Sequence, residues 1–336
     1  MKEEEIRPKD TLKMITEKHN LDIKKFFMND SNELDIDRMV YIDCPACGET
    51  KATIEFKKES FSFFRCDCNT LFVNPRPKKE VLAKFYSEAE SISLFMSEVL
   101  EKTAEIRKEK IFLPRVNMFL NLLDRYCDNR EMIIEIGGGN GLFLEKLKEK
   151  SGNFKKHLNI EPSTQACKLC VNRGIDVYEG VFEEFSGYEA EADVIVAFEL
   201  IEHLFSPKEF ILKAYSHLRP NGLLYLTTPN ILGFDLLLLG RLSDNINAPN
   251  HLNYFNIFSL SILLNACGFD VIEVQTPGQL DVNILENKYK EKIGLNIDKF
   301  TEFILNAKDN IKKKFQEFLS DNNLSSNMTM LARKRN

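Results

Sequence analysis

The sequence predicts an α/β fold in which seven strands form a mostly parallel sheet with helices on both of its faces. From Met132 onwards, short apolar runs alternate with segments of helical periodicity, and repeated strand–helix–strand units favour a parallel sheet. The first of these runs leads into the glycine-rich string IIEIGGGNG at residues 133–141. A glycine-rich turn between a strand and a helix is typical of a nucleotide-binding site.

The residues before the sheet divide into three segments of different composition. Residues 1–40 predict a polar helical segment with a weak apolar stripe. Residues 41–77 form a block rich in Cys, Pro, Gly and aromatic residues, and its closing string NPRP excludes regular structure because it holds two prolines. Residues 78–130 again predict helices, which we expect to act as a connector and as a cover of the active site.

The rest of the chain is expected to form one sheet domain, residues 131–277 with 326–336, interrupted by a helical insertion at 278–325. The expected strands are residues 132–136, 157–161, 175–178, 193–198, 222–228, 270–275 and 327–333. The expected helices are residues 141–150, 163–173, 206–218 and 257–267. In the insertion, apolar residues at three- and four-residue steps predict one amphipathic face, formed by Phe300, Ile304, Ala307, Ile311, Phe315 and Phe318.

Composition and charge narrow the classes of function. The 336 residues are 43% hydrophobic and 29% charged, which is typical of a globular chain. The net charge of −6 disfavours a general nucleic-acid binder, which needs a basic face. No stretch approaches the roughly 20 apolar residues of a membrane span, and the start MKEEEIRPKD lacks the apolar core of a signal peptide. We therefore expect a cytoplasmic protein without a nucleic-acid or membrane partner.

The spacing of the glycines indicates which nucleotide the turn suits. A dinucleotide fingerprint reads G-x-G-x-x-G, but Leu142 occupies its third glycine position, and the glycines run as Gly137, Gly139 and Gly141. Glu135 lies two residues before the first glycine. A carboxylate beside the turn suits a cationic ligand better than a pyrophosphate. S-adenosylmethionine fits this description, because it carries an ammonium and a sulfonium but no pyrophosphate.

The ends of the next strands support the same ligand. Glu161 ends the second expected strand, where a carboxylate can accept hydrogen bonds from both ribose hydroxyls. Phe182 and Glu183 follow the third strand, in a place where they could flank an adenine. FELIEHL gives the fourth strand an acidic end, and RPNGLLYLTTPN supplies a turn and the fifth strand. These signals follow one another at strand–helix–strand spacing and indicate one binding site.

The strings EIGGGNG, IEPS, FELIEHL and RPNGLLYLTTPN resemble the motifs of class I S-adenosylmethionine-dependent methyltransferases over residues 131–277 and 327–333. The resemblance implies a Rossmann-like sheet whose seventh strand is antiparallel. It also implies that the turn holds the methionyl end of the cofactor, Glu161 the ribose and the Phe182 loop the adenine. The Asn/Asp-Pro-Pro-aromatic string of adenine-amino methylases does not follow the fourth strand, which disfavours a nucleic-acid substrate.

Two close pairs of cysteines predict a structural zinc site in the block 41–77. The pairs are Cys44 with Cys47 in CPACGE, and Cys66 with Cys68 in FRCDCNTLF. Four thiolates suit tetrahedral Zn²⁺, and a block this short cannot bury enough apolar surface to fold alone. In the reducing compartment that we expect, metal ligation or plain burial of cysteines is favoured over disulfides.

The string CNTLFVNPRP resembles the end of an N-terminal zinc ribbon found in some bacterial small-molecule and sugar methyltransferases, with Asn69 in place of the usual Gly. This resemblance implies a ribbon that is structural and frames the substrate, because a closed four-ligand site has no open position for chemistry. Cys167 and Cys170 also have C-x-x-C spacing. They lie on an expected helix without a second pair, and we interpret them as part of a buried helix face.

Candidate catalytic residues follow the fourth and fifth strands, because ligands of open α/β sheets bind at the carboxyl ends of the strands. Glu199, Glu202 and His203 would share one face of a helical turn. They resemble the E-x-x-E-H string of ubiquinone-type O-methyltransferases and could bind Mg²⁺ or another divalent cation, or only orient the turn. His251 and Tyr254 resemble the H-x-x-Y-F string of sugar methyltransferases, in which the His can serve as base. The alternative is a loop His that bonds to the backbone.

The sequence thus predicts S-adenosylmethionine-dependent methyl transfer to a small-molecule acceptor, by direct displacement assisted by a His. The resemblance to sugar methyltransferases implies a sugar or glycan precursor as acceptor. One alternative is a quinone- or phenol-directed O-methyltransferase with a divalent cation at Glu199, Glu202 and His203. Another, of a different class, is a catalytically inactive zinc-ribbon interaction protein, but the intact glycine turn and Glu161 weigh against it.

Overall fold

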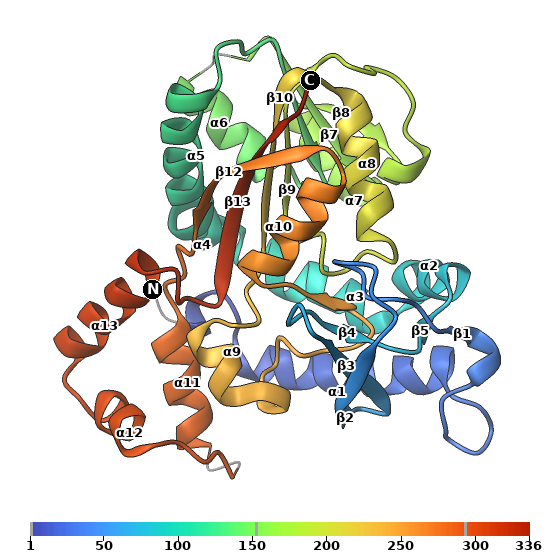
Figure 1. The fold of residues 1–336 in the computed structure, drawn as a ribbon, viewed down its shortest axis with the longest axis vertical. Coiled ribbons are helices and arrows are strands. Elements are labelled where there is room, and N and C mark those ends of the chain that lie inside the picture. Colours follow the sequence, from blue (N-terminus) through green and yellow to red (C-terminus); the bar gives the residue numbers. More distant parts are fainter. Residues whose placement is uncertain (1–2, 152–153, 292–293) are drawn as a thin grey trace. The chain divides into compact units, whose positions relative to one another are not determined.

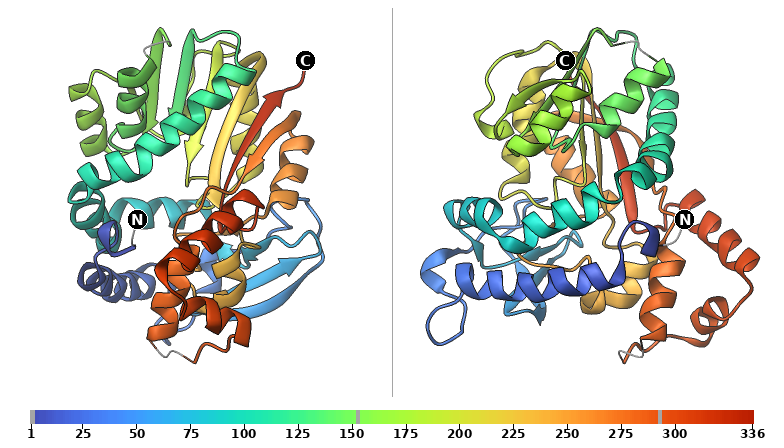
Figure 2. Two further views of the ribbon diagram at one scale, coloured as in Figure 1. Left: turned by 90° about the vertical axis from the view of Figure 1, so that its left-hand side faces the viewer. Right: turned by 180° about the vertical axis from the view of Figure 1, so that it is seen from behind.

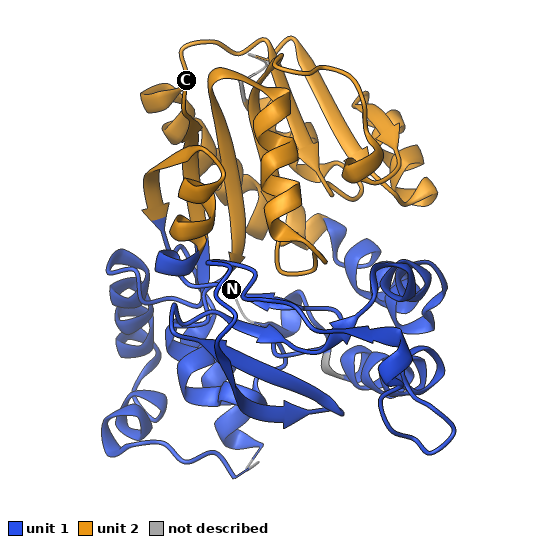
Figure 3. Cartoon of the chain, turned by 45° about the vertical axis from the view of Figure 1, so that its right-hand side comes forward, with its two compact units in different colours: residues 1–104, 229–259, 275–328 blue, residues 105–228, 260–274, 329–336 orange. Residues whose placement is uncertain are grey.

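A computed structural model describes residues 3–151, 154–291 and 294–336 of the chain. These residues divide into two compact units, each formed by three stretches of the sequence (Figure 3). Unit 1 comprises residues 1–104, 229–259 and 275–328, and unit 2 comprises residues 105–228, 260–274 and 329–336. Within the described ranges, no helix is both long and apolar enough to span a bilayer.

Unit 2 is built on the seven-stranded sheet that the sequence predicts (Figure 1). The strands lie in the order β12-β13-β10-β9-β6-β7-β8. Parallel pairing joins β6 to β7 and to β9, β7 to β8, and β9 to β10. The bounds are β6 (Met132–Ile136), β7 (Lys156–Glu161), β8 (Asp176–Glu179), β9 (Ala192–Phe198), β10 (Leu218–Pro229), β12 (Phe269–Gln275) and β13 (Asn327–Lys334).

The last strand, β13, runs antiparallel to its neighbours, as expected. Its end lies at the start of β12, because the backbone N of Arg335 donates to Gly268 O at 2.9 Å. Lys334 Nζ likewise donates to Leu218 O at the start of β10, at 2.6 Å. The strand order reverses between β6 and β9, and ligands of open α/β sheets bind at such a switch point, beyond the carboxyl ends of the strands. The topology therefore places the candidate site there.

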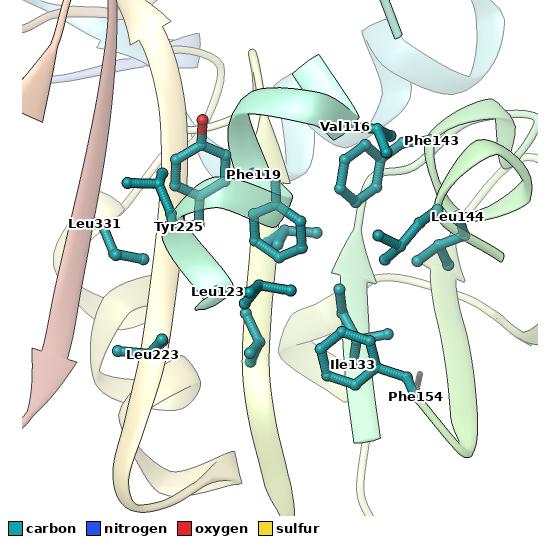
Figure 4. Packing of buried hydrophobic residues seen from close by; sticks show 14 of the residues in the cluster. Val116, Phe119, Leu123, Ile133, Phe143, Leu144, Phe154, Leu223, Tyr225 and Leu331 are labelled. Carbon is teal, nitrogen blue, oxygen red and sulfur yellow. The ribbon is translucent and has the colours of Figure 1, made fainter. Parts of the chain in front are cut away.

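The two faces of the sheet are buried by different helices (Figure 2). On one face, Phe119 and Phe143 pack over Ile133 and Tyr225, and none of the four is more than 1% exposed (Figure 4). Phe119 belongs to α5 (Leu113–Tyr126) and Phe143 to α6 (Leu142–Ser151). Alternate residues of a strand point to opposite faces, and the other face is covered by α8 (Pro207–His217) and α10 (Ile257–Ala266). Burial on both faces explains the nearly continuous apolar runs of the central strands.

Unit 1 holds a small antiparallel sheet with strand order β11-β4-β3-β2. Its strands are β2 (Ala52–Lys58), β3 (Phe61–Cys66), β4 (Leu71–Val73) and β11 (Asn253–Tyr254). Separately, β1 (Met39–Val40) pairs with β5 (Arg76–Pro77), so the prediction that the NPRP string excludes regular structure is wrong for its last two residues. Its core is aromatic: the Phe27 ring centroid lies 5.8 Å from that of Phe61 and 5.2 Å from that of Phe85. These rings attach the sheet to helices α1 (Lys9–Phe27) and α2 (Lys79–Glu88).

The segment between α2 and the main sheet is helical, as expected. Two of its stretches are π-helical rather than α-helical, at Phe95–Glu101 and Lys108–Phe112. They alternate with the short helices α3 (Glu90–Leu94) and α4 (Ala104–Arg107).

The insertion does not form the single amphipathic face that the periodicity predicts. Its described residues form three helices, α11 (Asp281–Lys290), α12 (Lys299–Leu305) and α13 (Asp309–Asp321). Within α12, Ile304 is buried while Phe300 is 61% exposed, and in α13 Phe318 is 51% exposed. The apolar spacing predicted helices here, but it predicted neither the break between them nor which of these residues are buried.

Two carboxyl groups meet in the interior of unit 1. Asp281 accepts hydrogen bonds from Ser325 Oγ and Gln316 Nε2, both at 2.7 Å, and from the backbone N of Ser326 at 2.6 Å. Asp235, on α9 (Phe234–Leu239), is 1% exposed. Burial, followed by the charge of Asp281, raises the pKa of Asp235 to about 8. Asp235 therefore carries a proton at neutral pH.

The substitution Asp235→Asn should make the stability less dependent on pH. The pKa of Asp235 is higher in the folded protein than the usual value of about 3.9, so its stabilising contribution is complete below that value and is lost as the pH rises towards about 8. Asparagine keeps a donor but does not titrate. We expect the free energy of unfolding of the variant to exceed that of the wild type increasingly with pH, by up to about 1.4 kcal/mol per pH unit. Denaturant titrations at several pH values measure the free energy of unfolding of both proteins. If it changes with pH equally in the wild type and the variant, this prediction is contradicted.

Candidate functional site

The glycine-rich turn joins β6 to α6 at the predicted edge of the sheet. Gly137, Gly139 and Gly141 have φ angles of +69°, +55° and +75°, a region that favours glycine. A Cβ on Gly138 would lie 2.4 Å from Asn159 Oδ1, whereas a Cβ on Gly139 would have no atom within 4 Å. The turn is therefore closely packed on one side and open at Gly139, so a ligand can approach the backbone there.

Two carboxylates lie on adjacent strands beside this turn. Glu161 ends β7, and its oxygens accept hydrogen bonds from the backbone N of Gly139 and of Ser163, each at 2.9 Å. Glu135, on β6, is 2% exposed, and its Oε2 has no hydrogen-bond partner among the described residues. Burial raises the pKa of Glu135 to about 8, and nearby Arg115 opposes this shift. An orphaned buried oxygen beside an open turn fits a ligand that donates hydrogen bonds, as an ammonium does.

In the loop after β8, the Phe182 ring is buried and Glu183 is exposed. Phe182 is 4% exposed and packs against Phe210 and His217, with centroid distances of 5.7 Å and 5.4 Å. Glu183 is exposed, and its backbone O accepts a hydrogen bond from Lys213 Nζ at 2.7 Å. The Phe182 ring therefore packs in the core and holds the loop in place. The exposed surface of the loop is formed by adjacent residues such as Glu183.

The acidic end of β9 is held by successive threonines of β10. Thr227 Oγ1 donates to Glu199 Oε1 at 2.7 Å, and Thr228 Oγ1 donates to Glu202 Oε2 at 2.9 Å. Glu202 is 1% exposed, and burial followed by the charge of Glu199 raises its pKa well above the usual range. His203 is half-buried and closes the turn through its backbone N, which donates to Leu200 O at 3.0 Å.

Residues His251 and Tyr254 lie in a loop of unit 1 that ends in β11. His251 Nδ1 lies 2.8 Å from Asn245 O, and because a carbonyl only accepts, Nδ1 carries the proton of the neutral imidazole. Tyr254 is 1% exposed, accepts a hydrogen bond from the backbone N of Asn247 at 3.0 Å and donates to His251 O at 3.2 Å. Tyr254 thus fixes the loop, and the bond of Nδ1 fixes the tautomer of His251.

The four cysteines of the block 41–77 converge at one point in unit 1. All four Sγ atoms lie within 4.8 Å of one another, with 3.6 Å between Cys44 and Cys68 and 3.5 Å between Cys47 and Cys66. These separations are too long for disulfides. A tetrahedral Zn²⁺ with bonds of about 2.3 Å would separate its sulfur atoms by about 3.8 Å. The donor set and spacing therefore fit a four-thiolate zinc centre.

The backbone around the cysteines supports the same geometry. Gly48, after the first pair, has a φ of +77°, and Asn69, after the second pair, has a φ of +61°. Asn is one of the few residues other than Gly that adopts this region readily, which explains why Asn69 can stand where related ribbons have Gly. The tight C-x-C spacing is thus compatible with a turn that points both thiols inward.

Three further residues of unit 2 lie near the glycine turn or the end of β9. Arg115 and Asn159 were not singled out in the sequence, whereas Cys170 was interpreted only as part of a buried helix face. Arg115, on α5, lies over the Phe198 ring at 4.5 Å and has its Nη2 4.0 Å from Glu199 Oε1. A single Arg on an amphipathic helix gives no sequence signal. Asn159 and Cys170 lie behind the glycine turn. A polar residue inside the apolar strand HLNIE, two positions before Glu161 and hence on the same face, was the available signal for Asn159.

Comparisons with known proteins match part of the chain. A family model described as a methyltransferase domain matches residues 104–274, just over half of the chain. A probable S-adenosylmethionine-dependent methyltransferase of Mycolicibacterium smegmatis is 27% identical over 166 residues, 49% of this chain and 62% of that protein. The ubiquinone biosynthesis O-methyltransferase of Rickettsia canadensis is 24% identical over 182 residues, 50% of this chain and 73% of that protein.

Among solved structures, a SAM-dependent methyltransferase from Archaeoglobus fulgidus is 18% identical, with a TM-score of 0.45, over 68% of this chain and 97% of that chain. The chain spans less than two thirds of the length of the Mycolicibacterium relative. The strand order of unit 2, with its antiparallel β13 and its glycine turn after β6, is the arrangement that the class I resemblance implies. The family match over half of the chain agrees with it, and the chain belongs to the methyltransferase domain family.

Proposed function

We propose that the protein transfers a methyl group from S-adenosylmethionine to a small-molecule acceptor. The observation that carries this proposal is the open glycine turn at Gly139 between the carboxylates of Glu135 and Glu161. The turn would hold the methionyl end of the cofactor, with Glu135 close to its ammonium. Glu161 would accept hydrogen bonds from the ribose hydroxyls, and the loop of Phe182 and Glu183 would border the adenine.

The cofactor, when bound, supplies a methyl group on a sulfonium that is already a good leaving group. The chain's own task is then to align the acceptor, exclude water and remove a proton. We assign the proton to His251, because the bond from Nδ1 to Asn245 O leaves the lone pair of the neutral imidazole on Nε2. Tyr254 would position the base. His203 is the alternative base, and Glu199 with Glu202 would then orient it or bind a divalent cation.

The four cysteines are proposed to bind one structural Zn²⁺. The support is the convergence of their four Sγ atoms and the positive φ angles that follow each pair. Burial raises the pKa of Cys66, and a bound cation would stabilise its thiolate. The zinc would fix the β3–β4 turn, and β4 pairs with β11, which carries Tyr254.

The acceptor is proposed to be a sugar or glycan precursor, on the resemblance of the zinc ribbon and of the His251–Tyr254 string. A quinone- or phenol-type acceptor is the second candidate, because ubiquinone biosynthesis O-methyltransferases are among the relatives. A screen of nucleotide sugars, free sugars and dihydroxyphenols with methyl-labelled cofactor separates the two. Label on a phenol alone would reject the sugar assignment, and label on neither class would reject both.

Removing the carboxylate of Glu161 should weaken cofactor binding. Glu161→Ala leaves the ribose hydroxyls without a charged acceptor, a loss of about 1.5–3 kcal/mol, so we expect the dissociation constant of S-adenosylhomocysteine to rise by about ten- to 150-fold. Isothermal titration measures it. Glu179→Ala is the matched control, because Glu179 ends the neighbouring strand β8 but is exposed. Equal affinity of the wild type and Glu161→Ala would mean that the ribose is held elsewhere.

A further inference from the structure

The two cysteines of the C-x-x-C string on α7 (Thr164–Asn172) are directed at the backbone of the candidate cofactor site. Cys170 Sγ lies 3.1 Å from Gly139 O, in the glycine turn. Cys167 Sγ lies 3.1 Å from the backbone O of Glu161. Both thiols are buried, and a carbonyl can only accept, so each thiol is the donor. One turn of helix thus bonds to both segments that we assign to the cofactor.

Asn159, on β7, also bonds to the glycine turn and lies in the same layer of buried side chains as Cys167 and Cys170. Its side chain is fully buried, its Oδ1 accepts a hydrogen bond from the backbone N of Gly138 at 3.1 Å, and its Nδ2 donates to Gly139 O at 3.2 Å. Nδ2 also lies 3.2 Å from Cys170 Sγ. The amide therefore bonds to consecutive residues of the turn, and Gly139 O receives two donors. A carbonyl with two buried donors has its orientation fixed.

The contacts behind the turn leave no space for a side chain at Gly138 or Gly141. A Cβ on Gly141 would lie 2.9 Å from Cys170 Sγ, and one on Gly138 would lie 2.4 Å from Asn159 Oδ1. The open side of the turn, at Gly139, lacks such neighbours. Burial raises the pKa of Cys170 to about 11, which keeps its sulfur protonated and able to donate at neutral pH. The layer is therefore built to hold the turn rather than to contact the ligand or to react.

We propose that Cys167, Cys170 and Asn159 are positioning residues for the cofactor, which fix the glycine turn and Glu161 relative to each other before the ligand binds. The inference rests on the proposed function, because it concerns how S-adenosylmethionine is held. A purely structural role, in which the two cysteines only fill a buried helix face, makes a different prediction. Their removal would then cost stability without a specific effect on the ligand.

The test compares Cys170→Ala with Cys170→Ser and with the control Cys267→Ala. Cys267 is also buried in unit 2, at 3% exposure, but it follows α10, which covers the opposite face of the sheet from α6. We expect Cys170→Ala to raise the dissociation constant of S-adenosylhomocysteine by about five- to tenfold, because one buried hydrogen bond to Gly139 O is lost. Cys170→Ser, which keeps a donor, should recover most of the affinity, and Cys267→Ala should bind like the wild type.

A kinetic measurement separates positioning of the cofactor from general damage. The KM for S-adenosylmethionine should rise in Cys170→Ala, while kcat and the KM for the acceptor stay near the wild-type values. Should Cys170→Ala not fold, Asn159→Ser, which removes the amide donor from the same carbonyl, allows the same comparison. Equal affinity in the wild type and these variants overturns the positioning inference alone. Absence of binding by folded wild-type protein overturns the proposed function and this inference with it.

Discussion

Replacement of His251 by asparagine is expected to lower kcat by about 10²–10⁴-fold, while the affinity for S-adenosylmethionine stays unchanged. Asparagine is the informative substitution, because its side-chain N–H can replace Nδ1 as the donor to Asn245 O. The loop is thereby kept, and only the basic Nε2 is lost. Methyl transfer measured at saturating cofactor, together with a binding titration, checks both parts of this expectation.

Two comparisons make the assignment of the base specific. Activity of the wild type should fall at low pH, because a protonated imidazole cannot remove a proton from the acceptor, and His251→Asn should lack this step. His203→Ala should retain most of the activity. If His203→Ala is inactive while His251→Asn is active, the base lies at the end of β9 and not in the His251 loop. Full activity of both variants would mean that the acceptor needs no base, as when it is already ionised.

The second large effect is expected from Cys44→Ser, which should release zinc and unfold the small sheet of unit 1. Structural zinc contributes about 10–16 kcal/mol of apparent binding free energy in small domains, far more than so short a sheet can replace. Metal analysis should find about one zinc per wild-type chain and almost none in the variant. Hydrogen exchange should show lost protection in β2, β3, β4 and β11, with β6 and β9 still protected.

Loss of the zinc should also disturb the loop that carries His251. Asn256 Nδ2 donates to Cys68 O at 3.1 Å, and the backbone N of Val73 donates to Leu252 O at 3.0 Å. β11 is thus bonded to the cysteine block just before it, at Leu252, and just after it, at Asn256. Cys44→Ser should therefore lose turnover as well as metal. Cys267→Ser, outside the cluster, is the control. Freshly purified wild-type protein without zinc or another thiophilic metal would contradict the zinc assignment.

The sequence was most informative where one physical constraint dominates. Strands buried on both faces must be apolar throughout, and the expected strand 132–136 coincides with β6 for that reason. The positive φ values of Gly137, Gly139 and Gly141 require glycine, so the turn was visible in the sequence. The four cysteines converge because the antiparallel pairing of β2 with β3 places Cys66 opposite Ala52 and so returns the chain to the first pair.

Other features depend on tertiary contacts that periodicity does not record. Phe182 was expected beside an adenine, but its ring lies in the core beside Phe210, and an aromatic residue at a strand end gives the same signal for both roles. The helical insertion breaks after Leu305, where nothing in its apolar spacing marks a boundary. Cys170 was interpreted as a buried helix residue, which is correct, but its bond to Gly139 O requires knowing which loop lies opposite.

The most direct test of the account is a calorimetric titration of the wild-type protein with S-adenosylmethionine and S-adenosylhomocysteine. We expect each ligand to bind at one site per chain and to raise the melting temperature, because a ligand that binds only the folded state stabilises it. Glu161→Ala should weaken both, since both contain the same ribose. Folded, zinc-loaded protein that shows neither heat of binding nor a shift in melting temperature with millimolar ligand would contradict the assignment of the glycine turn and Glu161 as the cofactor site.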